Sequence, residues 1–91
     1  MNSADKRHWL VVLAGPARKS LERVPTTDRR RIWLAIEEME VNPFRGDVRK
    51  LKGEHEGFRR RVGDWRVFFD VWPDDRRIVV TAIERRTSTT Y

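Results

Sequence analysis

The chain has 91 residues, of which 38% are hydrophobic and 37% charged, with a formal net charge of +6 and no cysteine. This length suits one domain over residues 1–91, and the clustering of the apolar residues argues against a disordered polyelectrolyte. The lack of cysteine excludes a disulfide framework, a thiol nucleophile and a cysteine-based zinc site. The N-terminus has no apolar stretch long enough for a signal peptide or a membrane span, so we expect a cytoplasmic protein with no membrane partner.

The positive charge is mostly arginine and lies toward the C-terminal half. Of the 20 basic residues 16 are arginine, and residues 48–91 carry eleven basic and seven acidic side chains. Arginine presents paired donors that suit phosphate, which favours a polyanionic partner. Charge alone leaves open whether that surface meets a nucleic acid, an acidic protein or only solvent.

The first half of the chain predicts a strand and then two helices. Residues 9–13 form a short apolar run that indicates a buried strand. Apolar residues at spacings of four and three over 17–24 predict a short amphipathic helix that ends before Pro25. A second helix is expected from Thr26 or Thr27 to Asn42-Pro43, with Trp33 in its core-facing stripe. The short turn between the helices indicates an antiparallel hairpin.

The second half predicts a sheet. A strand or its approach is expected at 51–53, followed by strands at 58–62, 65–71 and 78–83. Gly63-Asp64 and Pro73-Asp74-Asp75 are the turns between the last three strands. The expected architecture is therefore α+β: an N-terminal strand, a two-helix antiparallel hairpin and an antiparallel meander sheet, with the helices packed on one face.

Period-two alternation assigns the side chains of this sheet to a face covered by helices and an open face. Along 58–62 the two apolar ends should face the helices. Along 65–71 the alternate positions Trp65, Val67, Phe69 and Val71 should do so, which puts Phe68 on the open side with Arg66. Arginines at alternate positions, with one that follows the last strand, should then share the open, water-accessible surface: Arg59, Arg61, Arg66 and Arg85. Arg60 should point inward and reach solvent near an end of the sheet.

These segments carry a resemblance to a known family. The relevant residues are Lys50-Leu51-Lys52-Gly53, the block from Phe58 to Phe69, Ile83-Glu84-Arg85-Arg86 and Tyr91. They resemble the pattern of the RelE/ParE superfamily of bacterial toxin–antitoxin toxins. Asn42-Pro43 and the strand at 9–13 also fit, so the resemblance covers almost the whole chain.

The resemblance implies a RelE-like toxin of a type II toxin–antitoxin system that acts as a ribosome-dependent mRNA endoribonuclease. In such enzymes the RNA 2′-hydroxyl attacks the adjacent phosphate, leaving a 2′,3′-cyclic phosphate and a 5′-hydroxyl, with no metal or other cofactor. The implied partners are the ribosome, mRNA and an acidic cognate antitoxin, with operator DNA reached only through the antitoxin complex. We expect an amphipathic helix and an extended stretch of the antitoxin to cover the open face or the helix hairpin.

The resemblance also implies roles for single residues. Arg59 and Arg61 match positions that hold the phosphate and tune proton transfer, and Arg66 matches an arginine near the leaving oxygen. Arg85 matches an arginine that stabilises the transition state, and Tyr91 matches a C-terminal tyrosine that acts as a base or a stacking group. Further RNA contacts are expected from four basic residues: Lys50, Lys52, Arg29 and Arg30.

The sequence departs from the family pattern at the groups that would move protons. Lysine is frequent in the family where this chain has Arg59 and Arg61, and arginine does not exchange protons as lysine can. Arg49 stands where one branch of the family has the Glu of a Glu-plus-His pair. The general acid and base are therefore open, and His55 is the remaining titratable candidate.

Three functions remain open from the sequence. The first is the mRNA endoribonuclease, the second a ParE-like toxin that binds DNA gyrase and cleaves nothing, and the third a non-catalytic RNA-binding partner. The arginines could also be ordinary surface charge, paired locally with Asp64 or Asp70. A gyrase-binding toxin would not need an open-face arginine cluster with a C-terminal tyrosine, so the endoribonuclease is preferred.

Overall fold

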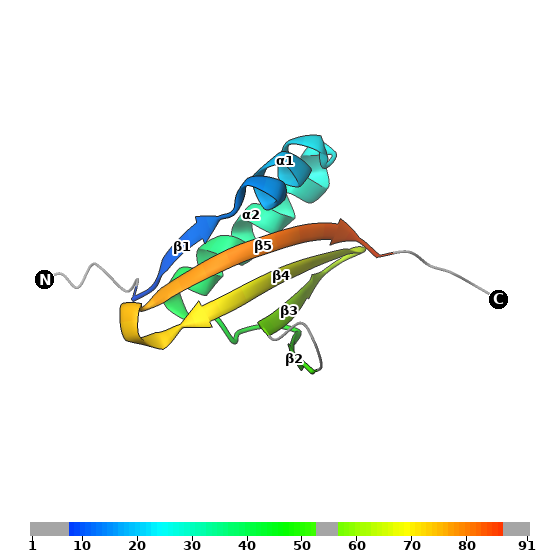
Figure 1. The fold of residues 1–91 in the computed structure, drawn as a ribbon. Coiled ribbons are helices and arrows are strands. Elements are labelled where there is room, and N and C mark those ends of the chain that lie inside the picture. The colour runs from blue at the N-terminus through cyan, green and yellow to red at the C-terminus, as the bar shows by residue number, and fades with distance from the viewer. Residues whose placement is uncertain (1–7, 53–56, 87–91) are drawn as a thin grey trace, which may run out of the picture.

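A five-stranded sheet carries both helices on one of its faces (Figure 1). The computed structural model describes residues 8–52 and 57–86 of the chain. In chain order the elements are β1 (Leu10–Leu13), α1 (Gly15–Arg23), α2 (Thr26–Val41), β2 (Val48–Leu51), β3 (Gly57–Val62), β4 (Trp65–Trp72), the 3-10 turn η1 (Pro73–Asp75) and β5 (Arg77–Arg85). The predicted α+β architecture is confirmed.

The sheet has the strand order β1-β5-β4-β3-β2. Strands β2 to β5 form the expected antiparallel meander, whereas β1 lies parallel to β5 at one margin. The position of the second strand differs from the prediction, because β2 ends at Leu51 instead of beginning there. It pairs with β3 from Val48 opposite Arg60 to Leu51 opposite Gly57.

Proline residues and an asparagine set the limits of the helices. Pro16 lies in the first turn of α1, where its fixed φ is compatible with a helix, and Val24 at the C-cap is extended ahead of Pro25. Helix α2 ends at Asn42, which is extended and whose Oδ1 accepts a hydrogen bond from the Phe44 amide at 3.0 Å. Neither helix in the described part of the chain is long and apolar enough to cross a membrane.

The core lies between the helices and the inward face of β4 and β5. Phe69 at its centre is 1% exposed and stacks on Phe58 of β3, with ring centroids 5.6 Å apart. The buried apolar residues of this cluster are Ala17, Leu21, Val24, Ile32, Ile36, Met39, Val67, Phe69, Ile78, Val80 and Ile83. Val67 and Phe69 on β4, and Ile78 and Val80 on β5, are two residues apart, as period-two patterning requires. A register shift between β4 and β5 at Phe68 and Phe69 interrupts this pattern, so that Ile83, three residues after Val80, is also buried.

Two side chains differ from their predicted environments. Trp33 is 42% exposed instead of belonging to the core, because it lies on the side of α2 that borders β1 and α1. Arg60 points inward as alternation requires, but it does not reach solvent at a sheet end. Its side chain is only 11% exposed and forms an ion pair with Glu38 of α2.

Substitution of Phe69 by alanine should destabilise the protein by about 3–5 kcal/mol, the usual cost of removing a buried phenyl ring. Urea denaturation followed by circular dichroism measures this loss. Phe44 provides the control because it is 50% exposed and contacts Phe58 edge-to-face. Phe44→Ala should cost less than about 1.5 kcal/mol. Equal losses for the two variants would contradict the placement of Phe69 at the centre of the core.

Candidate functional site

The hairpin of β3 and β4 brings arginines together on the face of the sheet that the helices do not cover. Arg61 and Arg66 are Cα partners in the antiparallel register, and Arg59 is paired with Phe68. Side chains directly opposite one another on neighbouring strands have Cβ atoms about 4.5–5.5 Å apart, and like charges there destabilise a sheet. The pairing of Arg61 with Arg66 therefore destabilises the sheet when no anion is bound. Because an anion between them would remove this repulsion, the pair marks a candidate anion-binding site.

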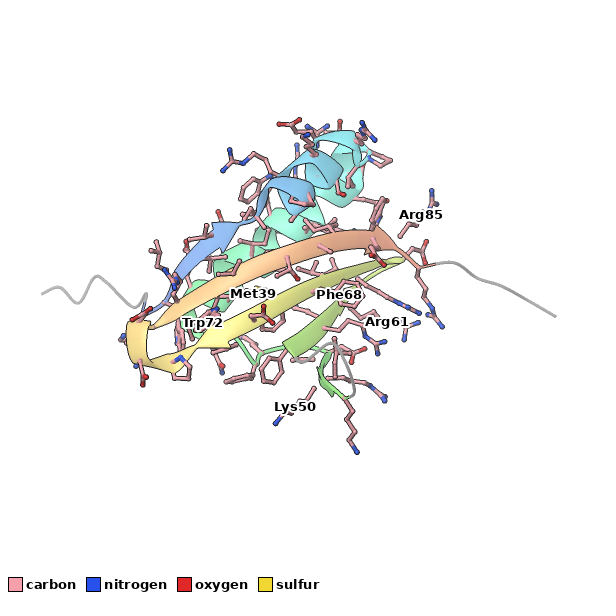
Figure 2. All side chains as sticks on the ribbon, viewed as in Figure 1. Met39, Lys50, Arg61, Phe68, Trp72 and Arg85 are labelled. Atoms are coloured by element: carbon pink, nitrogen blue, oxygen red, sulfur yellow. The ribbon has the colours of Figure 1, made fainter. Side chains whose placement is uncertain are left out.

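Four arginines line one small hollow on this face: Arg59, Arg61, Arg66 and Arg86. We call them the arginine cluster. The hollow has a volume of about 80 Å³, which corresponds to a few water-sized groups at roughly 30 Å³ each. It has room for an anionic group of a few heavy atoms, such as one phosphate. Figure 2 shows Arg61 extending on the side of the sheet away from Met39 and the helices.

No carboxylate neutralises the arginine cluster within the described residues. Glu84 is the Cα partner of Arg66, but no ion pair forms between them. Asp70 lies against the backbone of β3 instead, where a Cβ on Gly57 would be 2.5 Å from its Oδ1. The alternative in which Asp64 or Asp70 pairs with the arginines is therefore not found in the described part. The hollow keeps its positive potential, which favours a bound anion.

Arg85 does not share this surface, and the prediction that it does is wrong. Its Cα partner is Trp65, and its guanidinium carbon lies 5.9 Å from the centre of the Trp65 ring. The Trp65 Nε1 donates a hydrogen bond of 3.0 Å to Asp28 of α2, which places this ring on the helix side. Arg85 and Arg61 point away from each other in Figure 2.

Arg86 takes the place at the hollow that was expected for Arg85. The alternation that makes Ile83 inward sends Glu84 outward, Arg85 inward and Arg86 outward. The signal was present in the sequence, since Ile83 is plainly a core residue, but the strand was expected to end at that position. The family resemblance instead implies a role at this site for Arg85.

The four predicted RNA-contacting residues do not join the arginine cluster. Lys50 is the Cα partner of Phe58 and so points to the helix side of β2, while Arg49, paired with Arg59, shares the open face. Lys52 is exposed at the end of a described segment. Arg29 and Arg30 belong to α2, with Arg29 half-buried and Arg30 exposed.

Tyr91 and His55, the candidates for proton transfer, lie outside the described residues. Within the described ranges, no group of three His, Cys, Asp or Glu side chains is placed to hold a metal ion. The chemistry that the described site offers is therefore that of fixed positive charge.

A second surface lies at the margin of the sheet beside β1. A groove of about 480 Å³ is lined by eight residues: Val11, Val12, Leu13, Arg18, Leu21, Glu22, Arg29 and Trp33. The amide of Leu10 donates to the carbonyl of Arg76, just before β5, and the amide of Ala14 donates to the carbonyl of Val80 on β5, both at 2.9 Å. The amides of Val11 and Leu13 alternate with these and therefore point away from β5. Strand order leaves that edge of β1 unpaired in the described part of the chain. Free edges of this kind accept an added strand.

The chain matches the family of ParE toxins of type II toxin–antitoxin systems, parDE, over residues 11–89. It is 35% identical over 71 residues to a candidate toxin of Methanocaldococcus jannaschii named RelE1, covering 75% of this chain and 79% of the relative. A chain of the archaeal RelE–RelB complex from Pyrococcus horikoshii OT3 superposes with a TM-score of 0.78 at 26% identity, covering 90% of this chain and 99% of that one. A chain of the RelB–RelE complex from Methanococcus jannaschii gives a TM-score of 0.68 at 33% identity, over 82% and 89% of the two chains.

The fold and these matches define a small toxin of a type II toxin–antitoxin system, and the chain belongs to the RelE/ParE superfamily. Within that superfamily it is a toxin of the RelE type.

The contact between Glu38 and Arg60 makes stability depend on acidity. The hydrogen bond from Arg60 is the largest influence on the pKa of the Glu38 carboxyl and lowers it below its ordinary value of 4.5. Desolvation raises this pKa in part, and the charges of Arg60 and Arg45 lower it again. A carboxyl with a lowered folded-state pKa stabilises the fold above its unfolded pKa, and this contribution is lost as the pH falls through the folded-state pKa.

Glu38→Gln should therefore lower stability at pH 7 and reduce the further loss of stability below pH 4.5. Urea denaturation at pH 7, 5, 4 and 3 measures both effects. Glu37→Gln removes the same charge from an exposed neighbour on α2 and should leave the pH dependence close to that of the wild type. Parallel pH curves for Glu38→Gln and the wild type would contradict the assignment.

Proposed function

We propose that this toxin is a ribosome-dependent mRNA endoribonuclease in which the arginine cluster binds the scissile phosphate. One observation carries the proposal: four guanidinium groups surround a hollow of about 80 Å³ with no carboxylate partner among the described residues. Such an arrangement is costly for folding and suits a phosphate with two flanking ester oxygens. The likeness to RelE toxins supports the same reaction class.

In the proposed reaction the nucleophile comes from the RNA itself. The 2′-oxygen forms a bond to the adjacent phosphorus as its proton leaves, and the bond from phosphorus to the 5′-oxygen breaks as that oxygen gains a proton. The products are a 2′,3′-cyclic phosphate and a 5′-hydroxyl, and no water is consumed. The protein must hold the phosphate, stabilise the charge that develops on its oxygens and transfer two protons.

The arginine cluster can supply the first two of these requirements. Arg61 and Arg66 face each other across β3 and β4, so an anion between them contacts both strands, with Arg59 and Arg86 at its sides. Donors fixed before the reaction stabilise a developing charge without reorganisation. Arginine stays protonated and does not act as a base. The base therefore lies outside the cluster, and Tyr91 is the group that the family resemblance suggests for it.

The remaining basic residues suit contacts with RNA away from the cleaved bond. Arg30 is exposed on α2, and Lys50 points to the helix side of β2. Neither residue lines the hollow at the open face, but both can contact RNA elsewhere through its phosphate backbone. We assign them, with Arg29, Lys52 and Arg85, to ribosomal RNA contacts that orient the toxin on its substrate.

The proposed regulator is a cognate acidic antitoxin, as the RelE–RelB complexes of the relatives suggest. The groove beside β1 offers a free strand edge and an apolar floor that includes Leu21 and Trp33. An extended antitoxin segment can pair with β1 and place apolar side chains against that floor. Its carboxylates would suit the arginine cluster, where they would occupy the phosphate site.

Arg86→Ala should reduce cleavage on the order of 10²–10³-fold, the usual loss when one donor to a developing negative charge is removed. Arg85→Ala should have a much smaller effect, because Arg85 lies on the helix side against Trp65. The measurement is inducible expression followed by mapping of new mRNA 5′ ends within codons, with antitoxin absent. The two variants differ by one position and remove the same charge, so each is the control for the other.

A larger loss for Arg85→Ala than for Arg86→Ala would contradict the arginine cluster as defined. Growth arrest with intact mRNA and inhibited gyrase would instead support the ParE-like function. RNA binding that falls uniformly with salt, without cleavage, would support a non-catalytic RNA-binding role.

Trp33→Glu should weaken binding of the cognate antitoxin by about 2 kcal/mol or more, the usual effect of losing an aromatic anchor in a groove. Leu34 is the matched control, because it is 56% exposed on the same helix and does not line the groove. Leu34→Glu should cost less than about 1 kcal/mol. Calorimetric titration of each purified toxin with the antitoxin encoded beside it gives both values. Equal effects would place the antitoxin elsewhere on the toxin.

A further inference from the structure

Arg60 is the middle residue of three consecutive arginines, yet it points away from the other two. Arg59 and Arg61 line the hollow on the open face, whereas Arg60 points beneath the sheet toward α2. Its Nη1 donates a hydrogen bond of 3.3 Å to the carbonyl of Ala35, and its Nη2 donates to the Glu38 carboxylate. A partly buried charge must be paired and hydrogen-bonded, and α2 provides partners for both terminal nitrogens of Arg60, whereas its Nε is buried without a hydrogen-bond partner among the described residues.

The loop before β2 encloses the same guanidinium from the other side. Gly46 has a φ of +89°, and a Cβ on it would lie 2.9 Å from the Arg60 Cζ, so the backbone of this loop packs directly on the guanidinium. The main-chain carbonyl of the next residue, Asp47, accepts a hydrogen bond of 2.9 Å from the main-chain amide of Arg61. Helix α2, the Arg60 side chain and the loop therefore form one connected unit, and that unit ends at the backbone of a cluster residue.

Strand β3 has reason to need this support. Its outer neighbour is β2, a strand of four residues, and its inner neighbour is β4, which presents Arg66 directly opposite Arg61. Repulsion between these like charges acts across the pair of strands when no anion is bound. The attachment of Arg60 to α2 resists it on the opposite face of the same strand. Because Glu38 balances Arg60, this attachment adds no uncompensated charge near the cluster.

We propose that Arg60 and Glu38 are a positioning pair that fixes β3, and with it Arg59 and Arg61, in the geometry required for phosphate binding. The inference rests on the proposed function, since it deepens the account of the same site. Neither residue touches the hollow, so neither is a catalytic residue. In the run Arg59-Arg60-Arg61, two side chains bind the anion and the third holds the strand that carries them.

Glu38→Gln and Glu37→Gln form the matched pair for the test. Both remove one negative charge from α2, but Glu37 is exposed and forms no ion pair in the described part of the chain. Gly46→Ala is an independent second variant, because it disturbs the same guanidinium while leaving both charges in place. Thermal unfolding of each variant establishes that it is folded at the assay temperature.

Two readouts apply to each purified toxin. The first is the hydrogen exchange rate of the Arg61 amide, which is bonded to Asp47 and reports on the strand whether or not the protein cleaves RNA. The second is kcat and KM for cleavage on ribosomes programmed with a short mRNA. Misplacement of a binding group by about 1 Å can cost roughly 10²-fold in rate. In Glu38→Gln and Gly46→Ala the Arg61 amide should therefore exchange faster with solvent, and kcat should fall by up to roughly 10²-fold. Glu37→Gln should match the wild type in both measurements.

The two ways of failing are distinguishable. If Glu38→Gln and Gly46→Ala match Glu37→Gln in both readouts while Arg61→Ala is inactive, the positioning role is overturned and the proposed function stands. Faster exchange with unchanged kcat also overturns it. If the wild type itself does not cleave, the proposed function fails, and the positioning role is then judged by the affinity of each variant for a 2′-O-methyl RNA that cannot be cleaved. Equal affinities would overturn it there as well.

Discussion

The alternation of side chains along β3, β4 and β5 decides which residues form the core and which form the arginine cluster. Both helices lie on one face of the sheet, so the inward positions at the centre of β4 and β5 are buried, and the outward positions are free to carry charge. On β4, Val67 and Phe69 are buried, and Arg66 between Trp65 and Val67 faces outward. A slip of one residue in register would exchange the two sets, and the burial of Phe69 therefore also fixes the place of Arg66.

The same strands carry a favourable and an unfavourable set of contacts on their two faces. Packing of Val67, Phe69 and Ile83 under the helices stabilises the hairpin, and it offsets the repulsion between Arg61 and Arg66 on the open side. A fold with a weaker inner face could not hold these guanidinium groups opposite one another. The free energy gained by packing on the inner face thus offsets the repulsion between the arginines on the open face. A bound anion lowers the positive potential there.

Local patterns were enough to predict the elements and most of the faces, but not the contacts between segments far apart in the sequence. The helices and the last three strands follow from apolar periodicity and from turns such as Gly63-Asp64, and alternation placed Arg59, Arg61 and Arg66 together. The parallel pairing of β1 with β5 was not foreseen, because it joins strands about 67 residues apart without a local signal. The inward direction of Arg60 was predicted, but its ion pair was not, since its partner Glu38 is 22 residues away on α2. The last strand was predicted to end at Ile83, two residues before the observed end of β5. For that reason Arg85, and not Arg86, was predicted to lie on the open face.

The strand order also limits how one antitoxin can act on both surfaces of the toxin. The sheet edge beside the groove belongs to β1 and is unpaired within residues 8–52 and 57–86, whereas Arg61 and Arg66 lie on β3 and β4, and β5 separates this edge from β4. Strands are spaced about 4.8 Å apart, so β1 and β3 are separated by roughly 14 Å across the sheet. A segment paired with β1 must therefore leave that edge and cross the open face before its carboxylates reach the arginines, which takes about four extended residues. A helix packed only in the groove could hold the toxin without blocking the phosphate site, so neutralisation and affinity are separable properties of such a partner.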